Sequence, residues 1–256
     1  KVGLALSGGA ARGITHLGVI KALKEHHVPI DMIAGTSSGS LVGGLYSAGL
    51  DIDKMIDHVK ILRWLDLAGF HLSRKGVVSS RKLERFVRKL VGKIQLKDLS
   101  IPFKAIATDI LTGQSVELGD KDLLLSTAIR ASSSFPGIYP PVKIKGNYYI
   151  DGGASSNLPV NAVKSMGADF IIGVDAIPTA PLSKLPKNIP LMVDRGLDLI
   201  LSRTCKEECK AASVVLSPIT EYIHSFDIKK ADEIIQLGRD VVTQNLSKLK
   251  EVIYED

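Results

Sequence analysis

The sequence predicts an α/β fold, a three-layer α/β/α sandwich built around a central, mostly parallel sheet. An apolar run at residues 2–7 leads into a glycine-rich loop at 8–13, a helical pattern at 14–27 and a second apolar run at 30–34. A strand, a helix and a strand within about thirty residues form a βαβ unit, whose strands are parallel and whose crossover is right-handed. A further strand pattern at residues 169–175 extends the same sheet.

Length and composition are those of an ordinary globular protein. The chain has 256 residues, of which 45% are hydrophobic and 23% are charged. A chain of this length can bury a sizeable core, and this composition argues against disorder. Because no shift in composition, internal repeat or low-complexity tract marks a boundary, we expect a single domain over residues 1–256.

The remaining chain contains further helix and strand patterns. We expect helices at residues 41–48, 51–61, 80–91, 122–131, 157–166, 191–211 and 229–250, and strands at 103–108, 114–118, 142–144, 148–150 and 213–216. Two stretches allow two interpretations each. Residues 62–72, which carry the only tryptophan, are an interfacial flap or a cover of the core. The four-proline segment at 177–190 is a lid or a connector.

Basic residues outnumber acidic ones, with 33 Lys and Arg against 27 Asp and Glu and a net charge of +6. Such a surplus suits an anionic surface, for example phospholipid headgroups or nucleic acid. The basic residues are scattered, however, and 5% aromatic residues provide no stacking platform for bases. We therefore expect no nucleic-acid partner. A peripheral membrane contact and a plain solvated surface both remain compatible with the charge.

The two cysteines, Cys205 and Cys209, lie four positions apart in a helical pattern. No second pair completes a zinc site, and a disulfide framework needs more cysteines. We expect both to be plain helix residues and expect no structural metal.

The first ten residues resemble a signal peptide only superficially. A lysine and an apolar run of five residues lead directly into the glycine loop, as a first strand would. No stretch reaches the uninterrupted apolar length of a membrane span. We expect a cytoplasmic or peripheral membrane protein. An exported or cell-surface protein is the alternative, because the sequence starts at Lys1 and an upstream signal would lie outside it.

The most informative motif is G-T-S-S-G at residues 35–39, between a strand pattern and a helix pattern. In this context G-x-S-x-G forms a nucleophile elbow, a turn so sharp that Gly35 and Gly39 must lack side chains. The turn exposes the hydroxyl of Ser37, and the N-terminus of the following helix offers N–H groups to a developing negative charge. Ser37 is therefore the candidate nucleophile, although ordinary strand-to-helix turns also carry glycine and serine.

The glycine-rich loop allows two chemistries. A dinucleotide fingerprint requires G-x-G-x-x-G, but Ala10 occupies the middle position and the second strand lacks the expected acidic residue at its end. An oxyanion hole, formed by loop N–H groups, tolerates alanine more easily. The candidate residues for it are Gly8, Gly9, Ala10, Arg12 and Gly13. Arg12 has three possible roles: bonding neighbouring carbonyls, meeting an anionic headgroup, or carrying surface charge.

Asp151 closes the strand pattern at 148–150 and precedes Gly152 and Gly153, which leave room around its carboxylate. An Asp-Gly pair is also typical of a simple turn. If Ser37 is a nucleophile it needs a base, and the sequence leaves three alternatives open.

The first alternative is a triad of Ser37, Asp151 and His224, which has the order of an α/β-hydrolase but places the nucleophile too early in the sheet. The second uses His16, three residues past the glycine loop. In the third, Asp151 itself takes the proton, because partial burial beside Ser37 raises the proton affinity of a carboxylate.

Three motifs together resemble the signatures of patatin-like phospholipases. They are S-G-G-A-A-R-G at residues 7–13, G-T-S-S-G at 35–39 and D-G-G at 151–153. Further stretches resemble bacterial members, including those related to the catalytic domain of neuropathy target esterase: A-T-D at 107–109, the A-S-S run at 131–133 before Pro136, and N-L-P-V at 157–160.

This resemblance implies a lipid acyl hydrolase that acts on phospholipid or lysophospholipid esters with a Ser-Asp dyad and no metal or organic cofactor. By matching position, Ser37 attacks the ester carbonyl, Asp151 is general base and then general acid, and N–H groups around Gly9 and Ala10 hold the oxyanion. Ala10 departs from the third glycine of many relatives and puts a methyl group near the acyl site. Alanine also occurs there in relatives fused to outer-membrane barrels, in line with the exported alternative.

Two rival functions remain at this stage, a nucleotide-binding α/β module and a catalytically idle membrane-binding protein. The sequence does not indicate an oligomeric state.

Overall fold

The computed structural model describes residues 1–61, 69–73 and 76–254. Within these ranges an eight-stranded sheet contains β1 (Val2–Leu6), β2 (Met32–Thr36), β5 (Phe103–Asp109), β6 (Ser115–Leu118), β7 (Val142–Ile144), β8 (Asn147–Asp151), β9 (Phe170–Val174) and β10 (Val214–Leu216). The helices are α1 (Thr15–Glu25), α2 (Ser38–Ser47), α3 (Ile52–Ile61), α5 (Arg81–Val91), α6 (Leu125–Ser132), α7 (Val160–Ser165), α8 (Ile189–Cys209), α9 (Ala231–Gln244) and α10 (Leu246–Tyr254). Short 3-10 helices are η1 (Ala10–Ile14), η2 (Leu96–Asp98), η3 (Gly152–Ala154) and η4 (Ile228–Lys230).

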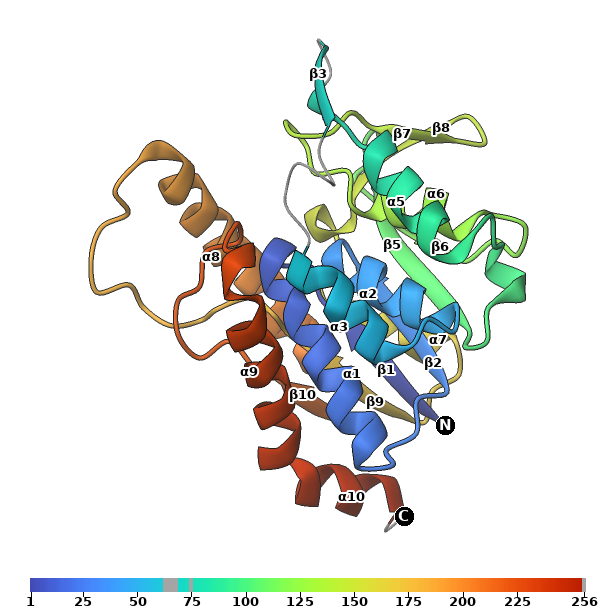
Figure 1. Ribbon diagram of the computed structural model, residues 1–256, viewed down its shortest axis with the longest axis vertical. Helices are drawn as coiled ribbons and strands as arrows, with labels where there is room; N and C mark the ends of the chain where they lie inside the picture. The colour runs from blue at the N-terminus through green and yellow to red at the C-terminus, as the bar shows by residue number, and fades with distance from the viewer. Residues whose placement is uncertain (62–68, 74–75, 255–256) are drawn as a thin grey trace.

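A separate antiparallel hairpin joins β3 (Gly69–Ser73) to β4 (Gly76–Ser79) and projects beyond the sheet (Figure 1). The sequence patterns did not predict this hairpin. The interfacial flap predicted at residues 62–72 falls on a segment whose side chains lie outside the described residues, so it stays a prediction.

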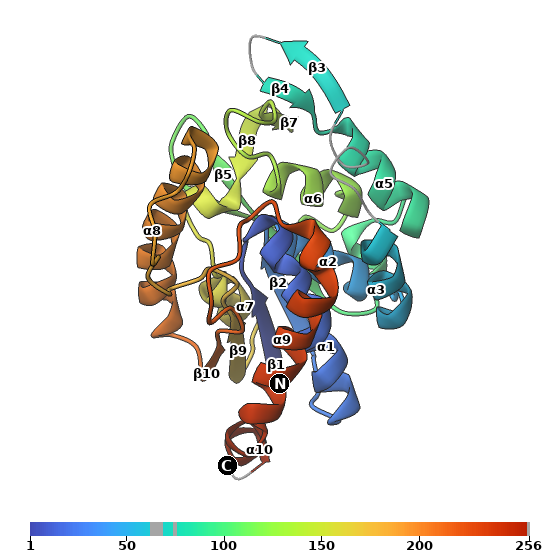
Figure 2. The same cartoon turned by 60° about the vertical axis from the view of Figure 1, so that its left-hand side comes forward.

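The sheet is mostly parallel, as predicted. Its strand order is β10-β9-β1-β2-β5-β8-β7, with β6 paired to β5. Strands β10, β9, β1, β2 and β5 run parallel to one another, while β6 and β8 are antiparallel to β5 and β7 is antiparallel to β8. Helices α1, α3 and α9 cover one face and α7 and α8 the other (Figure 2). The predicted α/β sandwich is confirmed; that residues 1–256 form one domain stays a prediction.

Strand β1 is apolar throughout because it is buried on both faces of the sheet. Leu4 and Leu6 belong to the larger core, which α1, α2 and α9 complete. Ala5, between them, belongs to a second core formed with α7 and with Cys205 of α8. Because alternate side chains of a strand point to opposite faces, a strand covered on both faces has no solvent-facing position for a polar residue.

Several predicted helices have different bounds in the structure, and asparagines explain two of these differences. The helix predicted at 229–250 is divided into α9 and α10 at Asn245, whose side-chain N–H donates to the carbonyl of Val241 at 2.8 Å and competes with the helical backbone. Helix α8 begins at Ile189, within the predicted proline segment. The side-chain oxygen of Asn188 caps it by accepting from the N–H of Leu191 at 3.1 Å.

One edge of β5 is shared by two strands. On one side β6 pairs with residues 105–108. On the other side β2 pairs with residues 103–106 and β8 with residues 107–109, so that Thr36 lies opposite Ile106 and Asp151 lies opposite Ala107. The last residue of β2 and the last residue of β8 therefore lie at successive positions along the same edge.

Helices α1 and α9 pack closely through two glycines. A Cβ on Gly18 would lie 1.9 Å from the carbonyl oxygen of Ile235, and one on Gly238 would lie 2.2 Å from the carbonyl oxygen of Thr15. In each helix a glycine, which has no side chain, therefore lies directly against a backbone carbonyl of the other helix. This close contact holds α1 and α9 together on one face of the sheet.

We predict that Gly18→Ala lowers the free energy of unfolding by roughly 2–3 kcal/mol, because the new methyl group forces α1 and α9 apart. Gly196→Ala in α8 is the matched control, since a Cβ there meets nothing within 4 Å. It is expected to raise the free energy of unfolding by about 0.5–1 kcal/mol. Urea unfolding measures both, and equal effects would contradict the described contact.

Candidate active site

Ser37 lies between the end of β2 and the start of α2 in a strained turn. Its φ of 52° and ψ of −119° are unusual for a residue with a side chain and cost on the order of 1–3 kcal/mol. The flanking glycines are required by space. A Cβ on Gly35 would lie 2.5 Å from the carbonyl carbon of Gly39, and one on Gly39 would lie 2.3 Å from the carbonyl oxygen of Leu6. These are the features of a nucleophile elbow.

The end of α6 holds the backbone on both sides of the site. The hydroxyl of Ser132 accepts a hydrogen bond from the N–H of Ser37 at 3.0 Å, and the hydroxyl of Ser133 donates to the carbonyl of Ser37 at 3.3 Å. At the next residue, the carbonyl of Ser134 accepts from the N–H of Asp151 at 3.0 Å. One helix end therefore positions the candidate nucleophile and the candidate base together.

Asp151 brings a buried carboxylate to Ser37. The residue is 4% exposed, and its carboxylate accepts a hydrogen bond from the N–H of Gly153 at 2.8 Å. Burial raises the pKa of Asp151 to about 6, while hydrogen bonds from the side chain of Ser37 and the N–H of Gly153 oppose the rise. Since a Cβ on Gly152 would lie 2.3 Å from the carbonyl oxygen of Ile106, this glycine allows the turn to lie directly on β5.

Two backbone N–H groups of the glycine-rich loop have no hydrogen-bond acceptor within the described residues. The N–H groups of Gly9 and Ala10 make no bond to protein atoms within the described residues, whereas that of Ala11 donates to the carbonyl of Ser225 at 2.9 Å. Ala10 has a φ of 52°, so it occupies a conformation that favours glycine. The loop also lies against the elbow, because a Cβ on Gly8 would be 3.2 Å from the Cβ of Ser37.

Three residues of the predicted oxyanion hole have other roles. The N–H of Gly8 donates to the carbonyl of Asn157 at 3.2 Å and that of Arg12 to the carbonyl of Gly9 at 3.1 Å, so both donors are already in use. Gly13 provides space, since a Cβ there would lie 2.2 Å from the hydroxyl oxygen of Ser38. The oxyanion hole of Gly8, Gly9, Ala10, Arg12 and Gly13 stays a prediction, and the motif alone does not reveal that the fold already uses the N–H groups of Gly8 and Arg12.

The side chain of Arg12 braces the loop from inside the protein. Only 2% of it is exposed, and it forms two hydrogen bonds to the carboxylate of Asp198 on α8, at 2.6 Å and 2.8 Å. Its Nε also donates to the carbonyl of Gly9 at 3.3 Å. Of the three roles considered for Arg12, the bond to a neighbouring carbonyl is confirmed. The headgroup contact and the surface charge are wrong, because the guanidinium is buried and paired.

His16 and His224 interact with groups other than Ser37 and Asp151. His16 is fully buried, its Nε2 lies 2.8 Å from the carbonyl oxygen of Ser7, and burial lowers its pKa to about 4. A neutral His16 therefore donates to that carbonyl. His224 faces a different carboxylate, with its Nδ1 3.7 Å from Asp194. The triad through Asp151 and His224 is thus not assembled in this structure.

The remaining groups that could bind a metal are acidic side chains, histidines and the two cysteines. Among the described residues, no group of three or more His, Cys, Asp or Glu side chains has the placement of metal ligands. Cys205 and Cys209 are free thiols on α8, and burial raises the pKa of Cys205. The side-chain amide of Asn157 donates to the sulfur of Cys205 at 3.3 Å.

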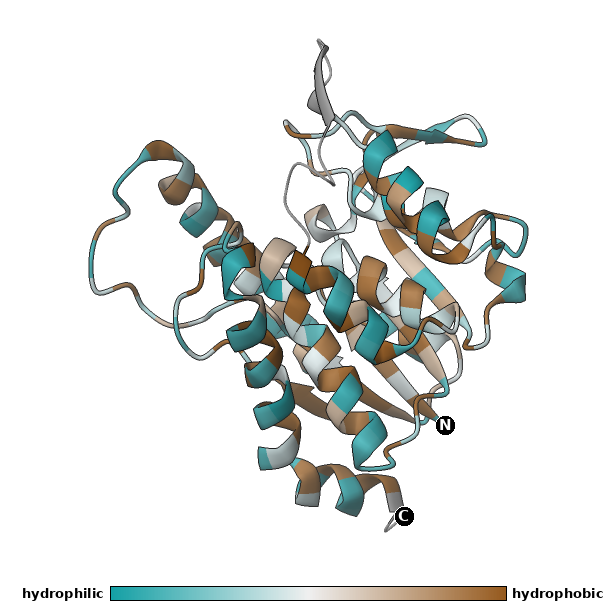
Figure 3. Ribbon diagram, in the orientation of Figure 1, coloured by the Kyte–Doolittle hydropathy of each residue, from teal (hydrophilic) through white to brown (hydrophobic). Residues whose placement is uncertain are grey.

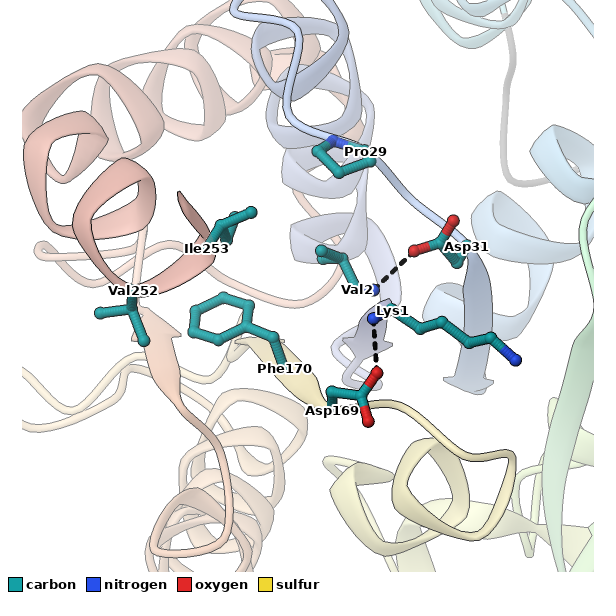
Figure 4. A pocket seen from close by; sticks show the side chains of 8 residues that line it. All are labelled: Lys1, Val2, Pro29, Asp31, Asp169, Phe170, Val252 and Ile253. Carbon is teal, nitrogen blue, oxygen red and sulfur yellow. Dashed lines mark hydrogen bonds and ion pairs between the residues drawn. The ribbon is translucent and has the colours of Figure 1, made fainter. Parts of the chain in front are cut away.

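Figure 4 shows a hollow at the amino-terminal ends of the parallel strands, opposite the ends where Ser37 lies. It is lined by Lys1, Val2, Pro29, Asp31, Asp169, Phe170, Val252 and Ile253. Val2 and Phe170 are the first residues of β1 and β9, whereas Ser37 follows the last residue of the parallel strand β2. This hollow is therefore separate from the candidate active site.

Comparisons with known proteins assign the chain to a family that matches the α/β fold and the three sequence motifs. The chain belongs to the patatin-like phospholipase family, whose family model matches residues 4–164. It is similar to Lysophospholipase NTE1 of Eremothecium gossypii, with 33% identity over 270 aligned residues that cover 93% of this chain and 18% of that protein. It is also similar to an uncharacterized NTE family protein of Mycobacterium bovis, with 39% identity over 182 residues that cover 68% of this chain and 48% of the relative. The predicted resemblance is confirmed.

Solved structures support the fold alone. VipD from Legionella pneumophila has a TM-score of 0.56 and 15% identity, over 96% of this chain and 66% of VipD. The type III effector protein ExoU has a TM-score of 0.50 and 13% identity, over 96% of this chain and 53% of ExoU.

Sequence reasoning missed the positioning role of α6. The A-S-S run at residues 131–133 was noted only as part of the family resemblance, and nothing in it indicated a bond to Ser37. Ser132 follows Ser37 by 95 positions, so no local spacing connects the two.

We predict that Ser132→Ala lowers the free energy of unfolding by about 1–3 kcal/mol, because the N–H of Ser37 loses its acceptor. Ester hydrolysis should fall as well, since the strained turn is no longer fixed. The control is Ser134→Ala, whose hydroxyl donates only to the carbonyl of Arg130 at 2.8 Å. If both variants behave alike in urea unfolding and ester hydrolysis, Ser132 does not position the turn.

Asp151 makes folding depend on pH in a direction that can be measured. The pKa of Asp151 is about 6 in the folded protein, compared with the ordinary value of 3.8 for an aspartate, which we take for the unfolded chain. The folded state therefore binds the carboxyl proton of Asp151 more tightly than the unfolded state does. Its contribution to the free energy of unfolding is therefore greatest below about pH 4 and is lost as the pH rises through about 6.

We predict that Asp151→Asn becomes more stable than the original chain as the pH rises from about 4 to about 8, by at most about 3 kcal/mol. Urea unfolding at the two pH values measures the difference. Asp57→Asn, which changes an exposed carboxyl on α3, is the control. A stability difference that does not change with pH would show that burial does not raise the proton affinity of Asp151.

Proposed function

We propose that this protein hydrolyses carboxylic esters of phospholipids or lysophospholipids through a dyad of Ser37 and Asp151 and an acyl-Ser37 intermediate. The observation that carries the proposal is the meeting of a strained serine turn with a buried carboxylate, at successive positions along β5, where the side chain of Ser37 lowers the pKa of Asp151 against the effect of burial. Two groups of this kind on one strand edge are what nucleophilic catalysis requires.

In the first step Asp151 acts as general base. Its ionised carboxylate accepts the hydroxyl proton of Ser37 while the oxygen attacks the ester carbonyl carbon. When the tetrahedral intermediate collapses, the bond from carbon to the leaving alkoxide breaks, and protonated Asp151 returns the proton to the alcohol. A pKa of about 6 suits both roles, because the group is mostly ionised near neutral pH and still accepts a proton readily.

The negative charge on the carbonyl oxygen needs donors that the fold does not use. The N–H groups of Gly9 and Ala10 meet this condition, and the N-terminus of α2 adds its partial positive charge beside Ser37. Arg12 fixes the loop through the carbonyl of Gly9 and through Asp198 without touching the substrate. In this role Arg12 is a positioning residue.

In the second step water replaces the alcohol. Asp151 takes a proton from the water molecule, whose oxygen attacks the acyl carbon, and the bond to the oxygen of Ser37 breaks. The proton then passes from Asp151 to Ser37, which restores both groups. Every step uses residues of this chain, so the proposed reaction requires no cofactor.

A lipid ester as substrate is supported by family membership and by the printed name of the relative Lysophospholipase NTE1. The chain spans 18% of that relative, so the substrate is a proposal for this part of the protein. We place the reaction at a membrane surface, where such substrates reside.

A nucleotide-binding role has less support. A bound pyrophosphate needs the N–H groups of the glycine loop, but that of Gly8 already bonds to Asn157. The methyl group of Ala10 also occupies the position at which the fingerprint requires close approach.

We predict that an alkyl phosphonate labels the protein once, at Ser37, and that Ser37→Ala abolishes both the label and ester hydrolysis. Asp151→Asn should lower turnover at least about 100-fold, because it removes the general base. His16→Ala and His224→Ala should keep turnover per folded molecule, since neither histidine contacts the dyad. The measurements are intact mass, and hydrolysis of p-nitrophenyl butyrate and of lysophosphatidylcholine.

A folded protein with no adduct on Ser37 would contradict the acyl-enzyme. A histidine variant that is folded but inactive would contradict the dyad in favour of a triad. Retained vesicle binding with no hydrolysis by the original chain would instead identify a catalytically idle membrane-binding protein.

A further inference from the structure

Helix α8 has an unusual distribution of polar and apolar residues. Ile189, Met192, Val193, Leu199 and Ile200 are between 46% and 76% exposed and form what we call the apolar stripe. At 3.6 residues per turn, these positions cover about one third of the circumference of the helix. In Figure 3 the outlying first turns of α8 carry hydrophobic segments. The stripe therefore faces away from the sheet.

The opposite side of α8 carries two buried carboxylates. Asp198 is 1% exposed and binds Arg12, and Asp194 is 5% exposed and accepts from the N–H of Ser225 at 3.2 Å and from its hydroxyl. Rotating the helix to bury the stripe would leave Arg12 as an unpaired buried charge, which costs several kcal/mol. The ion pair thus fixes the rotation of α8 and keeps the stripe outside.

Helix α8 also contacts both sides of the candidate active site. Through Asp198 it binds Arg12 of the glycine-rich loop. Through Leu201, whose Cδ2 would lie 3.6 Å from a Cβ on Gly153, it reaches the turn that follows Asp151. Figures 1 and 2 show α8 lying outside the sheet, with the preceding loop extending beyond it. A surface that binds the stripe would therefore lie close to the site.

The charges around the stripe are positive. Lys184, Lys187, Arg203 and Lys206 are exposed, and within the described part of the chain none of them forms an ion pair. Of the acidic residues of α8, Asp194 and Asp198 are buried, and the exposed Glu207 near the end of the helix is neutralised by Lys210 at 2.7 Å. An apolar face bordered by lysine and arginine is typical of a helix that lies in the interface of an anionic membrane.

We propose that the apolar stripe of α8 docks on the surface of an anionic lipid bilayer, a proposal that rests on the lipid ester substrate proposed above. A second copy of the chain fits this face less well, because a two-fold pairing of identical surfaces brings the same four cations together. Within the described residues no helix is long and apolar enough to cross a bilayer.

The test compares vesicle binding by two charge-matched variants. Ile189→Glu/Ile200→Glu places two carboxylates in the stripe. Gln244→Glu/Ser247→Glu adds the same charge at exposed positions of α9 and α10, at the other end of the sheet. Cosedimentation with phosphatidylcholine–phosphatidylglycerol vesicles measures binding, circular dichroism confirms folding, and hydrolysis of soluble p-nitrophenyl butyrate reports the site independently of a lipid surface.

We expect the stripe variant to bind these vesicles at least about tenfold more weakly and the control to bind as the original chain does. Hydrolysis of the soluble ester should be unchanged in both. Lys184→Gln/Lys187→Gln should weaken binding to the anionic vesicles and reduce its dependence on salt.

Equal vesicle binding by the stripe variant and the original chain would overturn the proposal. So would a dimer, detected by sedimentation velocity, that the stripe variant dissociates while vesicle binding persists. An original chain that binds vesicles through the stripe but hydrolyses no ester would refute the proposed function and leave the docking surface in place.

Discussion

The arrangement of Ser37 and Asp151 depends on one shared edge of strand β5. Parallel β2 pairs with the first part of that edge and ends at Thr36, while antiparallel β8 pairs with the second part and ends at Asp151. Because the two strands approach from opposite directions, their last residues meet at the middle of β5. The three serines at the end of α6 then fix the backbone on both sides of this junction. The proposed dyad thus depends on strand register more than on any loop.

Both members of the proposed dyad are held in states that oppose folding. Ser37 occupies a left-handed conformation, and Asp151 is buried without a cation beside it among the described residues. The cost of each is of the same order as one good core contact, and the surrounding hydrogen bonds and close glycine contacts offset it. The same burial makes Asp151 a better proton acceptor than a carboxylate in water. Burial of Asp151 is therefore the physical cause both of this local instability and of the reactivity that we propose.

The sequence predicted those features that depend on local spacing. The βαβ unit, the sharp turn at Ser37 and the carboxylate at the end of a strand each follow from residues close together in the chain. Arg12 shows where such reasoning ends, because its partner Asp198 lies 186 positions away and only the packed structure brings the two together. The break at Asn245 was missed for a related reason, since a continuous helical pattern does not show that a side chain competes for a carbonyl.

The pairing of Arg12 with Asp198 connects the glycine-rich loop to the outer surface of the protein. An ordinary surface helix buries its apolar side, whereas α8 buries its carboxylates and exposes its apolar stripe. If a membrane binds α8 more tightly when Arg12 is paired, reciprocity requires the membrane to stabilise that pair by the same free energy. The carbonyl of Gly9, which Arg12 also binds, would then be held more firmly on a lipid surface than in solution. Through this one guanidinium, docking would order the N–H donors that the proposed reaction needs.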